Sequence, residues 1–233
     1  MKIGAYLKSS FSDYPGKVAA VIFTLGCNFR CPWCYNPGLV DPQRYVEPIP
    51  EEEILESLAR RRRYIDSVVI SGGEPTLQPD LVSFIQRLKD MGFQIKLDTN
   101  GSRPEVVFQL LEQGLLSCLA VDYKLPLRFY REILSSPETP LGEDIGLKVK
   151  ETLILALKYA GGYWRTTVVP RLHTPRIIEE MIREAEQMAK EAGVTPPTWG
   201  EKRWRVQEFW DTGDLVGPRL WEDEAFLASW ESQ

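Results

Sequence analysis

The chain has 233 residues, of which 43% are hydrophobic, and it carries a net charge of -5. That length and composition suffice for one domain with a substantial core. A net negative charge argues against a general binder of nucleic acid, because such proteins concentrate basic residues on at least one face. We therefore expect a single domain over residues 1–233, with its core at about residues 16–210 and a tryptophan-rich C-terminal extension at about residues 211–233.

The apolar segments indicate a protein that does not enter a membrane. The longest, VAAVIFTL at residues 18–25, is too short to span a bilayer, and the start MKIGAYLKSS lacks the apolar core of a signal peptide. We expect a cytoplasmic location, where thiols stay reduced. The basic run ARRRRYID closes a segment that opens with EEEILESL, which is the charge order that a solvated helix favours.

Apolar strand-like runs alternate with amphipathic helical segments along the chain. The expected strands are VAAVIFTL, SVVIS, FQIKLDT, LAVDYK, RTTVVP and RWRVQEFW. The expected helices lie near Glu51–Arg62, Pro79–Met91, Pro104–Gln113, Gly146–Tyr159 and Pro175–Ala192. This alternation is typical of βα units with a parallel sheet, and six units fall short of the eight that close a full barrel. We predict an α/β fold: a partial (βα)6 open TIM-like barrel of parallel strands.

Three of the four cysteines lie directly after the first expected strand, in FTLGCNFRCPWCYNPG, as Cys27, Cys31 and Cys34. Reduced thiols point to metal or redox chemistry. A structural zinc site needs a fourth ligand, and only Cys118 and His173 are of the usual types. Cys118 lies in an apolar run and is more simply a core residue. An iron–sulfur cluster fits better, because three thiolates leave one iron free.

Polar residues follow the other expected strands, and in parallel βα folds these strand ends form the ligand site. They are Gly72, Gly73 and Glu74 in SGGEP, Asp98 in DTNG, Asp122 and Lys124 in VDYK, Arg165 in YWRTTVVP, and His173 in RLH. Each has a structural alternative: a tight turn for the glycines, mutual ion pairs for the charged residues, and a structural role for the lone histidine. As ligands, the carboxylates suit amino or ribose groups, and Lys124 suits a carboxylate.

The spacing Cys-x-x-x-Cys-x-x-Cys, with Trp33 before the last cysteine, resembles the signature of the radical S-adenosylmethionine enzymes. The resemblance implies that the three cysteines hold a [4Fe–4S] cluster whose open iron is chelated by the amino and carboxylate groups of S-adenosylmethionine. An electron from the reduced cluster then breaks the sulfonium bond and releases a 5′-deoxyadenosyl radical.

The same resemblance assigns a role to one segment outside the cysteine loop, and position at the strand ends suggests two more. SGGEP is similar to the superfamily's GGE segment, which contacts the methionine amino group of the cofactor. From its charge, Lys124 is expected at the methionine carboxylate, and from its location beyond a strand end, His173 is expected at the ribose. The full set of expected cofactor-binding residues is Trp33, Gly72, Gly73, Glu74, Asp98, Asp122, Lys124, Arg165 and His173.

Longer stretches resemble one group within that superfamily. SSFSDYPGKVAAVIFTLGCNFRCPWCYNPGLV, SGGEPTLQPDL, LDTNGSRPE and AVDYKLP together are similar to the activating proteins of anaerobic ribonucleoside-triphosphate reductase, and more distantly to the pyruvate formate-lyase activating enzymes. This chain has Tyr35 where many of these relatives have histidine. The resemblance implies hydrogen abstraction from a glycine of a large partner enzyme, with a low-potential electron donor such as flavodoxin or ferredoxin.

Other functions stay open at this point. The chain could activate a different glycyl radical enzyme, or act on a small molecule as 7-carboxy-7-deazaguanine synthase does. A non-enzymatic metal or redox module would not explain why four strand ends carry polar groups. The late tryptophans Trp199, Trp204, Trp210, Trp221 and Trp230 could meet a partner or cover the open edge of the barrel, and covering a core is the commoner use.

Overall fold

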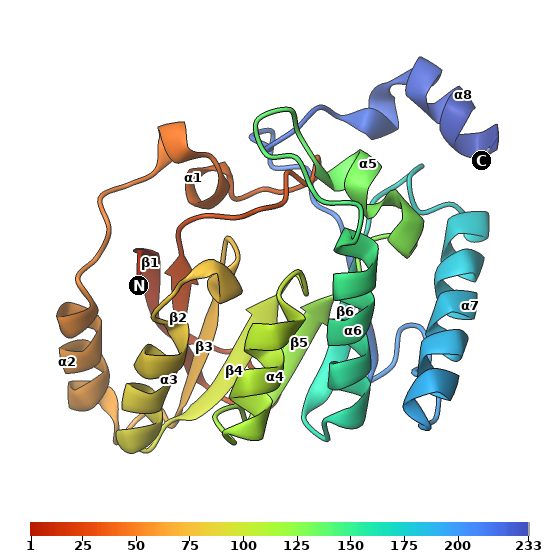
Figure 1. The fold of residues 1–233 in the computed structure, drawn as a ribbon. Coiled ribbons are helices and arrows are strands. Elements are labelled where there is room, and N and C mark those ends of the chain that lie inside the picture. Colours follow the sequence, from red (N-terminus) through yellow and green to blue (C-terminus); the bar gives the residue numbers. More distant parts are fainter. Residues whose placement is uncertain (233) are drawn as a thin grey trace.

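The computed structural model describes residues 1–232 and contains a curved, mostly parallel sheet with helices on its outer side (Figure 1). The strands are β1 (Ile3–Ser10), β2 (Ala19–Thr24), β3 (Ser67–Gly72), β4 (Gln94–Thr99), β5 (Cys118–Asp122), β6 (Gly162–Val168) and β7 (Trp204–Glu208). They are hydrogen-bonded in chain order, and β2 to β7 are all parallel. The predicted open α/β barrel is confirmed.

Five helices cover the outer side of the sheet (Figure 1). They are α2 (Glu51–Arg61), α3 (Leu81–Asp90), α4 (Pro104–Glu112), α6 (Ile145–Lys158) and α7 (Pro175–Ala192). These are the five helices that the hydrophobic periodicity predicts. The clearest case is α7, which begins after the capping hydroxyl of Thr174 and ends at Gly193, whose φ of 69° suits a residue without a side chain.

Shorter helices lie beyond the C-terminal ends of the strands (Figure 1). They are α1 (Pro37–Val40), α5 (Tyr130–Leu134) and α8 (Glu224–Ser232). Single 3-10 turns occur at Pro42–Arg44, Pro75–Leu77, Leu127–Phe129 and Leu220–Glu222. The sequence patterns did not predict these elements. The 3-10 turns, α1 and α5 have at most five residues, which is too short to establish a helical period, whereas α8 has nine and was missed despite its length.

Strand β1 was also not predicted, and it adds an antiparallel strand to the expected sheet. It pairs with β2, with Ile3 opposite Thr24 and Tyr6 opposite Ile22. Three consecutive residues near its end, Leu7–Ser9, are exposed, so the strand lacks the alternation of buried and exposed residues that identifies the others.

The two faces of the sheet differ in chemistry. Toward the helices, the strands present large apolar residues such as Ile22, Ile70 and Leu97, which belong to the main core. The inner face carries smaller residues and a second buried cluster, composed of Tyr14, Ala19, Val21, Val69, Cys118, Ala120 and Tyr163. Cys118 is therefore a buried strand residue, as expected. Because side chains alternate along a strand, the charged residues Lys96 and Asp98 of β4 also fall on the inner face.

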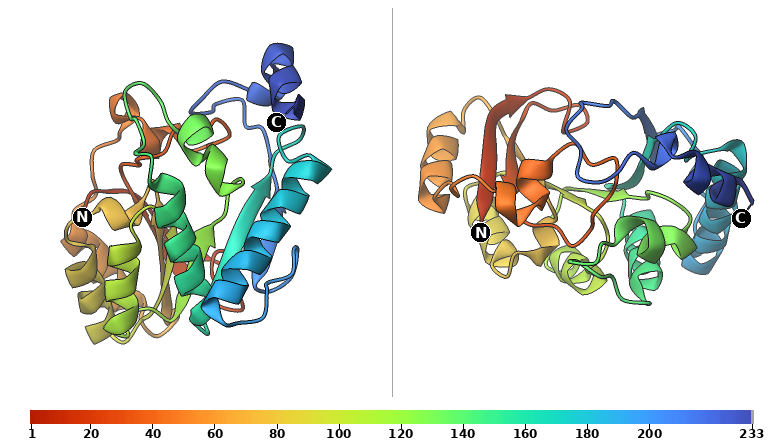
Figure 2. Two further views of the ribbon diagram at one scale, coloured as in Figure 1. Left: turned by 45° about the vertical axis from the view of Figure 1, so that its right-hand side comes forward. Right: turned by 90° about the horizontal axis from the view of Figure 1, so that it is seen from above.

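The C-terminal segment runs across the side of the sheet that no helix covers (Figure 2, right). Trp204, Trp221 and Trp230 are buried, and Trp199 packs edge-on against Trp204 at 4.9 Å between ring centroids. Trp210 differs, since it is 75% exposed. Most of the late tryptophans thus cover the core. Within residues 1–232, no helix is both long and apolar enough to cross a membrane.

Candidate active site

The cysteine loop, residues 26–34, follows β2 and is held from two sides. The backbone N–H of Arg30 donates to the Leu134 carbonyl at 2.8 Å, and the Arg30 guanidinium donates to the Cys27 carbonyl at 2.8 Å. From the C-terminal segment, the N–H of Val216 donates to the Cys34 carbonyl at 2.9 Å. Segments far apart in sequence therefore fix the path of this loop.

The glycine pair after β3 lets two backbones approach closely. A Cβ atom on Gly73 would lie 2.1 Å from the Gly26 carbonyl oxygen, and one on Gly72 would lie 2.3 Å from the Thr24 nitrogen. The space instead holds backbone hydrogen bonds, from Gly73 to Thr24 at 2.9 Å and from Glu74 to Gly26 at 2.7 Å. Packing alone thus requires both glycines, and it joins SGGEP to the start of the cysteine loop.

The three loop thiols lie close enough to influence one another electrostatically. Burial raises the pKa of all three above the ordinary value, that of Cys31 to about 12. In residues 1–232, no three cysteine, histidine or acidic side chains stand close enough to share one metal ion. Cysteine thiolates are the normal ligands of a four-iron cluster, so the donor set of these three loop thiols is of the kind that such a cluster takes.

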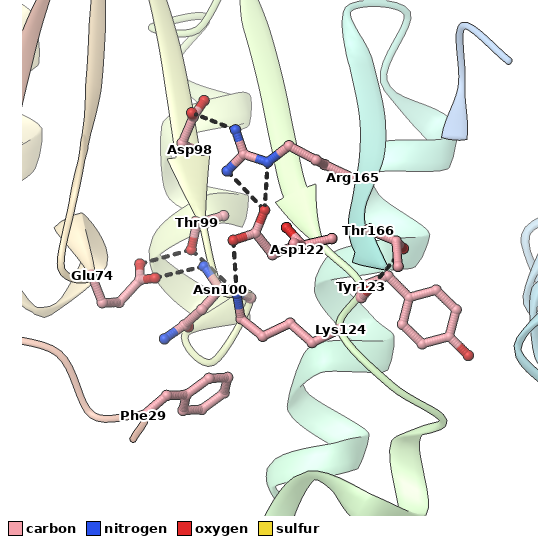
Figure 3. Close-up of polar contacts among 12 residues, drawn as sticks. Phe29, Glu74, Asp98, Thr99, Asn100, Asp122, Tyr123, Lys124, Arg165 and Thr166 are labelled. Carbon is pink, nitrogen blue, oxygen red and sulfur yellow. Dashed lines mark hydrogen bonds and ion pairs between the residues drawn. The ribbon is translucent and has the colours of Figure 1, made fainter. Parts of the chain in front are cut away.

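A chain of alternating charges crosses the inner ends of β4, β5 and β6 (Figure 3). Asp98 accepts a hydrogen bond from Arg165 at 3.1 Å, and Arg165 also donates to Asp122 at 2.8 Å. The second oxygen of Asp122 accepts from the Lys124 ammonium at 2.9 Å. At the other end, Asp98 pairs with Lys96. The structure therefore joins Asp98, Asp122, Lys124 and Arg165, and it adds Lys96, which the sequence analysis missed.

Asp122 and Lys124 stay ionised at neutral pH. Burial disfavours the charge on Asp122, but Arg165 and Lys124 outweigh it and hold the pKa of Asp122 at about 2. Burial is likewise outweighed at Lys124, where Asp122 raises the pKa above its ordinary value. Lys124 in turn opposes the effect of burial on the pKa of Cys31 and Cys34. Its ammonium is therefore within electrostatic range of the cysteine loop.

Glu74 is fully buried and satisfied by the protein itself (Figure 3). One oxygen accepts from the Thr76 N–H at 3.0 Å, the Thr76 hydroxyl at 2.5 Å and the Thr99 hydroxyl at 2.7 Å. The other accepts from the Asn100 N–H at 2.6 Å. These partners connect the loop after β3 to the end of β4. In this geometry the Glu74 carboxylate joins the two loops through donors of the protein itself, and its contact with an ammonium ligand stays a prediction.

Asn100 links β4 to the cysteine loop and was missed within the DTNG motif. Its side-chain amide donates to the Asn28 carbonyl oxygen at 2.9 Å and approaches the Cys27 sulfur at 3.8 Å. Its own oxygen accepts from the Ser102 N–H at 2.9 Å. A polar residue following a strand end was the available signal, but only the contact across 72 residues identifies its partner.

His173 and Trp33 lie together, with ring centroids 6.2 Å apart in an edge-on arrangement. The His173 Nδ1 accepts from the Val169 N–H at 3.0 Å, and its Nε2 lies 2.8 Å from the Lys124 carbonyl, to which it donates. Burial lowers the pKa of this histidine, so the ring is neutral. With both ring nitrogens engaged, His173 supports the backbone at Lys124, and its expected contact with a ribose stays a prediction.

Tyr35 points toward solvent next to the exposed indole of Trp210. It is 46% exposed and borders a surface cleft of about 330 Å³ together with Gln207, Glu208, Trp210 and Thr212. This cleft joins the end of the cysteine loop to β7, the strand at the open edge of the sheet.

Comparison with known proteins identifies the family. The profile of the radical SAM superfamily matches residues 21–141. A protein of Methanocaldococcus jannaschii, provisionally named a glycyl-radical enzyme activating enzyme, is 38% identical over 173 residues, which cover 73% of this chain and 70% of that protein. Over shorter segments the chain is 36% identical to the pyruvate formate-lyase-activating enzyme of Clostridium pasteurianum and 35% identical to the 7-carboxy-7-deazaguanine synthase of Hyperthermus butylicus.

These shorter matches span less than two fifths of either protein: 38% of this chain and 39% of the Clostridium enzyme, and 39% of this chain and 38% of the Hyperthermus enzyme. Among solved structures, native anSMEcpe with bound AdoMet shares the fold, with a TM-score of 0.56 and 20% identity over 80% of this chain and 49% of that one. The superfamily profile covers more than half of the chain, including all three loop cysteines. The chain belongs to the radical SAM superfamily.

Proposed function

We propose that this protein is an activase that holds a [4Fe–4S] cluster on Cys27, Cys31 and Cys34 and installs a glycyl radical on anaerobic ribonucleoside-triphosphate reductase. The observation that carries the proposal is the Lys124 ammonium beside the cysteine loop. Of its three N–H donors, one binds Asp122, and within residues 1–232 the other two have no partner. They are available for the carboxylate of a cofactor bound next to the loop cysteines.

The chain's residues then divide into ligands and supports. The three cysteines hold the cluster, and Lys124 binds the carboxylate end of S-adenosylmethionine while Asp122 and Arg165 fix its direction. Glu74 and Asn100 hold the loops on either side. When bound, the reduced cluster and S-adenosylmethionine supply a carbon radical able to abstract hydrogen from a glycine.

The choice of a protein substrate rests on the open side of the barrel and on the relatives. Strands β1 and β7 are the two unpaired edges of the sheet, so the inner face is not enclosed by strands. The Methanocaldococcus relative, which carries an activase name, is matched over 70% of its own length. A low-potential donor such as flavodoxin or ferredoxin would reduce the cluster, and such chemistry belongs to an anaerobic cytoplasm.

Electron paramagnetic resonance on the partner tests this function. The reconstituted protein, a reductant and S-adenosylmethionine are mixed anaerobically with the reductase of the same organism, and the radical signal is measured. We expect a doublet signal in the spectrum of the reductase. The glycine-to-alanine variant of the reductase should not show this signal. Deoxyadenosine formation without a radical on the reductase contradicts the activase proposal and leaves the cofactor chemistry in place.

A small-molecule radical enzyme is the second candidate, favoured by the similarity to 7-carboxy-7-deazaguanine synthase. The test is the rate of deoxyadenosine formation with the purified small substrate and no second protein. An acceleration by that substrate supports this candidate, whereas an acceleration only with a glycyl radical enzyme, including one other than the reductase, supports the activase class.

A further inference from the structure

Lys96 is a fully buried cation that the proposed function does not yet use. Its side chain is 1% exposed and projects from the middle of β4 onto the inner face of the sheet. Its ammonium pairs with Asp98 and lies 5.9 Å from the centre of the Tyr163 ring. A buried ammonium is costly unless it is paired, so its place in the sheet depends on Asp98.

The two oxygens of Asp98 have different partners. Oδ1 binds Lys96, and Oδ2 accepts from Arg165 at 3.1 Å. Asp122 repeats this division, with Oδ1 bound to Arg165 and Oδ2 to Lys124. Each of these two carboxylates therefore has a different cation on each oxygen, and neither is bound through both oxygens by Lys96, Arg165 or Lys124.

We infer that Lys96 is a positioning residue: by occupying Oδ1 of Asp98, it keeps Arg165 shared between Asp98 and Asp122, and it thereby orients Lys124 toward the cofactor. Without Lys96, both oxygens of Asp98 become available to Arg165. A guanidinium binds a carboxylate best through two parallel hydrogen bonds. Arg165 would then move toward Asp98 and release Asp122, and the Asp122–Lys124 pair would lose its fixed direction.

The expected effect on cofactor affinity rests on the proposed binding of S-adenosylmethionine. The arrangement of the ion pairs from Lys96 to Lys124 does not depend on that proposal. Exposure separates the two ends of this series of charges: the Lys96 and Asp98 side chains are 1% and 6% exposed, whereas those of Arg165, Asp122 and Lys124 are 27%, 22% and 16% exposed. Lys96 therefore cannot touch a ligand near the cysteine loop, and it acts only through Asp98 and Arg165.

The test uses the full-length protein with Lys96→Met, which keeps the length but removes the charge, and Lys96→Gln, which keeps an N–H donor for Asp98. Lys150→Met is the matched control, because Lys150 also forms an ion pair, with Glu191 on the helical surface. The first measurement is hydrogen exchange at the Arg165 Nε–H by nuclear magnetic resonance, which needs no cofactor. The second is the Kd for S-adenosylmethionine after reconstitution with iron and sulfide.

If Lys96→Met folds, we expect hydrogen exchange at the Arg165 Nε–H to be at least about tenfold faster, because Lys96 and Arg165 are coupled through one ion-pair network. The Kd for S-adenosylmethionine should rise about tenfold, and the iron content should not change. Lys96→Gln should bind S-adenosylmethionine about threefold more weakly. If Lys96→Met does not fold, the exchange rate and affinity of Lys96→Gln alone test whether Lys96 positions Arg165. Lys150→Met should match the wild type. Unchanged exchange and affinity in the Lys96 variants overturn the inference. Failure of the wild type to bind S-adenosylmethionine contradicts the proposed function instead, and Arg165 exchange then decides the positioning role.

Discussion

Glu74 and Asp122 are both carboxylates beside the cysteine loop, and their surroundings are opposite. Glu74 has no exposed surface and accepts hydrogen bonds only from hydroxyl and backbone N–H groups. Asp122 has a side chain that is 22% exposed and lies between two cations. A carboxylate whose oxygens are all hydrogen-bonded to neutral donors of the protein fixes the backbone around it. A carboxylate between cations leaves one of them, Lys124, oriented and with N–H groups to spare for a ligand.

Both arrangements matter for chemistry only if the adjacent loop holds the cluster, so the largest expected effect is at a cysteine. Cys31→Ala should abolish the cluster, because two remaining loop thiolates cannot hold it. Iron content and visible absorption after anaerobic reconstitution measure this. Cys118→Ala is the control and should keep full iron content, since Cys118 lies in β5. An intact cluster in Cys31→Ala would show that this loop does not hold the cluster through its three cysteines, and the comparison of Glu74 with Asp122 would then have no bearing on the chemistry.

Replacing Glu74 tests the structural side of the comparison. Glu74→Gln puts a donor group where the protein presents only donors, and it should lower the free energy of unfolding by about 3 kcal/mol. Chemical denaturation of the full-length protein measures this. Glu56→Gln on the surface of α2 is the control and should change stability by less than about 0.5 kcal/mol. If Glu74→Gln is stable and fails only to bind S-adenosylmethionine, Glu74 is a ligand.

Replacing Lys124 tests the ligand side. Lys124→Met should weaken S-adenosylmethionine binding by about ten- to a hundredfold, because a charge-assisted hydrogen bond contributes about 1.5–3 kcal/mol. Isothermal titration gives the Kd, and iron content should not change. Lys17→Met is a suitable control, because Lys17 pairs with Asp66 at the opposite end of β3. Wild-type affinity in Lys124→Met would show that its ion pair serves the fold alone.

The pH dependence of stability separates the two carboxylates further. The pKa of Asp122 is about 2 in the folded protein, against an ordinary value of 3.8. Its ion pairs therefore stabilise the fold fully above about pH 4, and this stabilisation is lost as the pH falls toward 2. The contribution is about 2 kcal/mol. Denaturation between pH 5 and pH 2 should show a smaller decline for Asp122→Asn than for the wild type; equal declines would contradict this account.

Replacing an exposed tryptophan should have the smallest effect on stability, and replacing a buried one provides the contrast. Trp210→Ala should change the free energy of unfolding by less than about 0.5 kcal/mol, because the side chain is largely exposed. Trp204→Ala should cost about 3–5 kcal/mol, because it removes a buried indole that hydrogen-bonds to Thr166 at 2.9 Å. Thermal denaturation of both variants measures the difference. A large loss in Trp210→Ala would mean that it supports the fold.

The sequence predicted the parts of the molecule that local periodicity determines. The parallel strands, the long helices and the position of the cysteine loop after β2 all follow from such patterns. Strand β1 could not be found this way, since its pairing with β2 is not encoded in its own exposed residues.

The partners of the site residues were beyond prediction for a related reason. In QIKLDT, alternation suggests that Lys96 faces solvent, yet in an open barrel that face is the interior. The donors to Glu74 come partly from Asn100, which is distant in sequence. Only the folded backbone decides which polar groups meet, and the same holds for the two nitrogens of His173.

The hydrogen bond from Val216 to Cys34 has a consequence for the order of assembly. Ribosomal synthesis produces the cysteine loop after only two of the strands, whereas Val216 follows the last strand. During translation the nascent loop therefore lacks one of its supports while five strands are still missing, and closing so long a sequence separation is slow. Iron delivered before that closure meets thiols on a loop whose path is not yet fixed. Cluster insertion is therefore expected to be most efficient after the chain has left the ribosome.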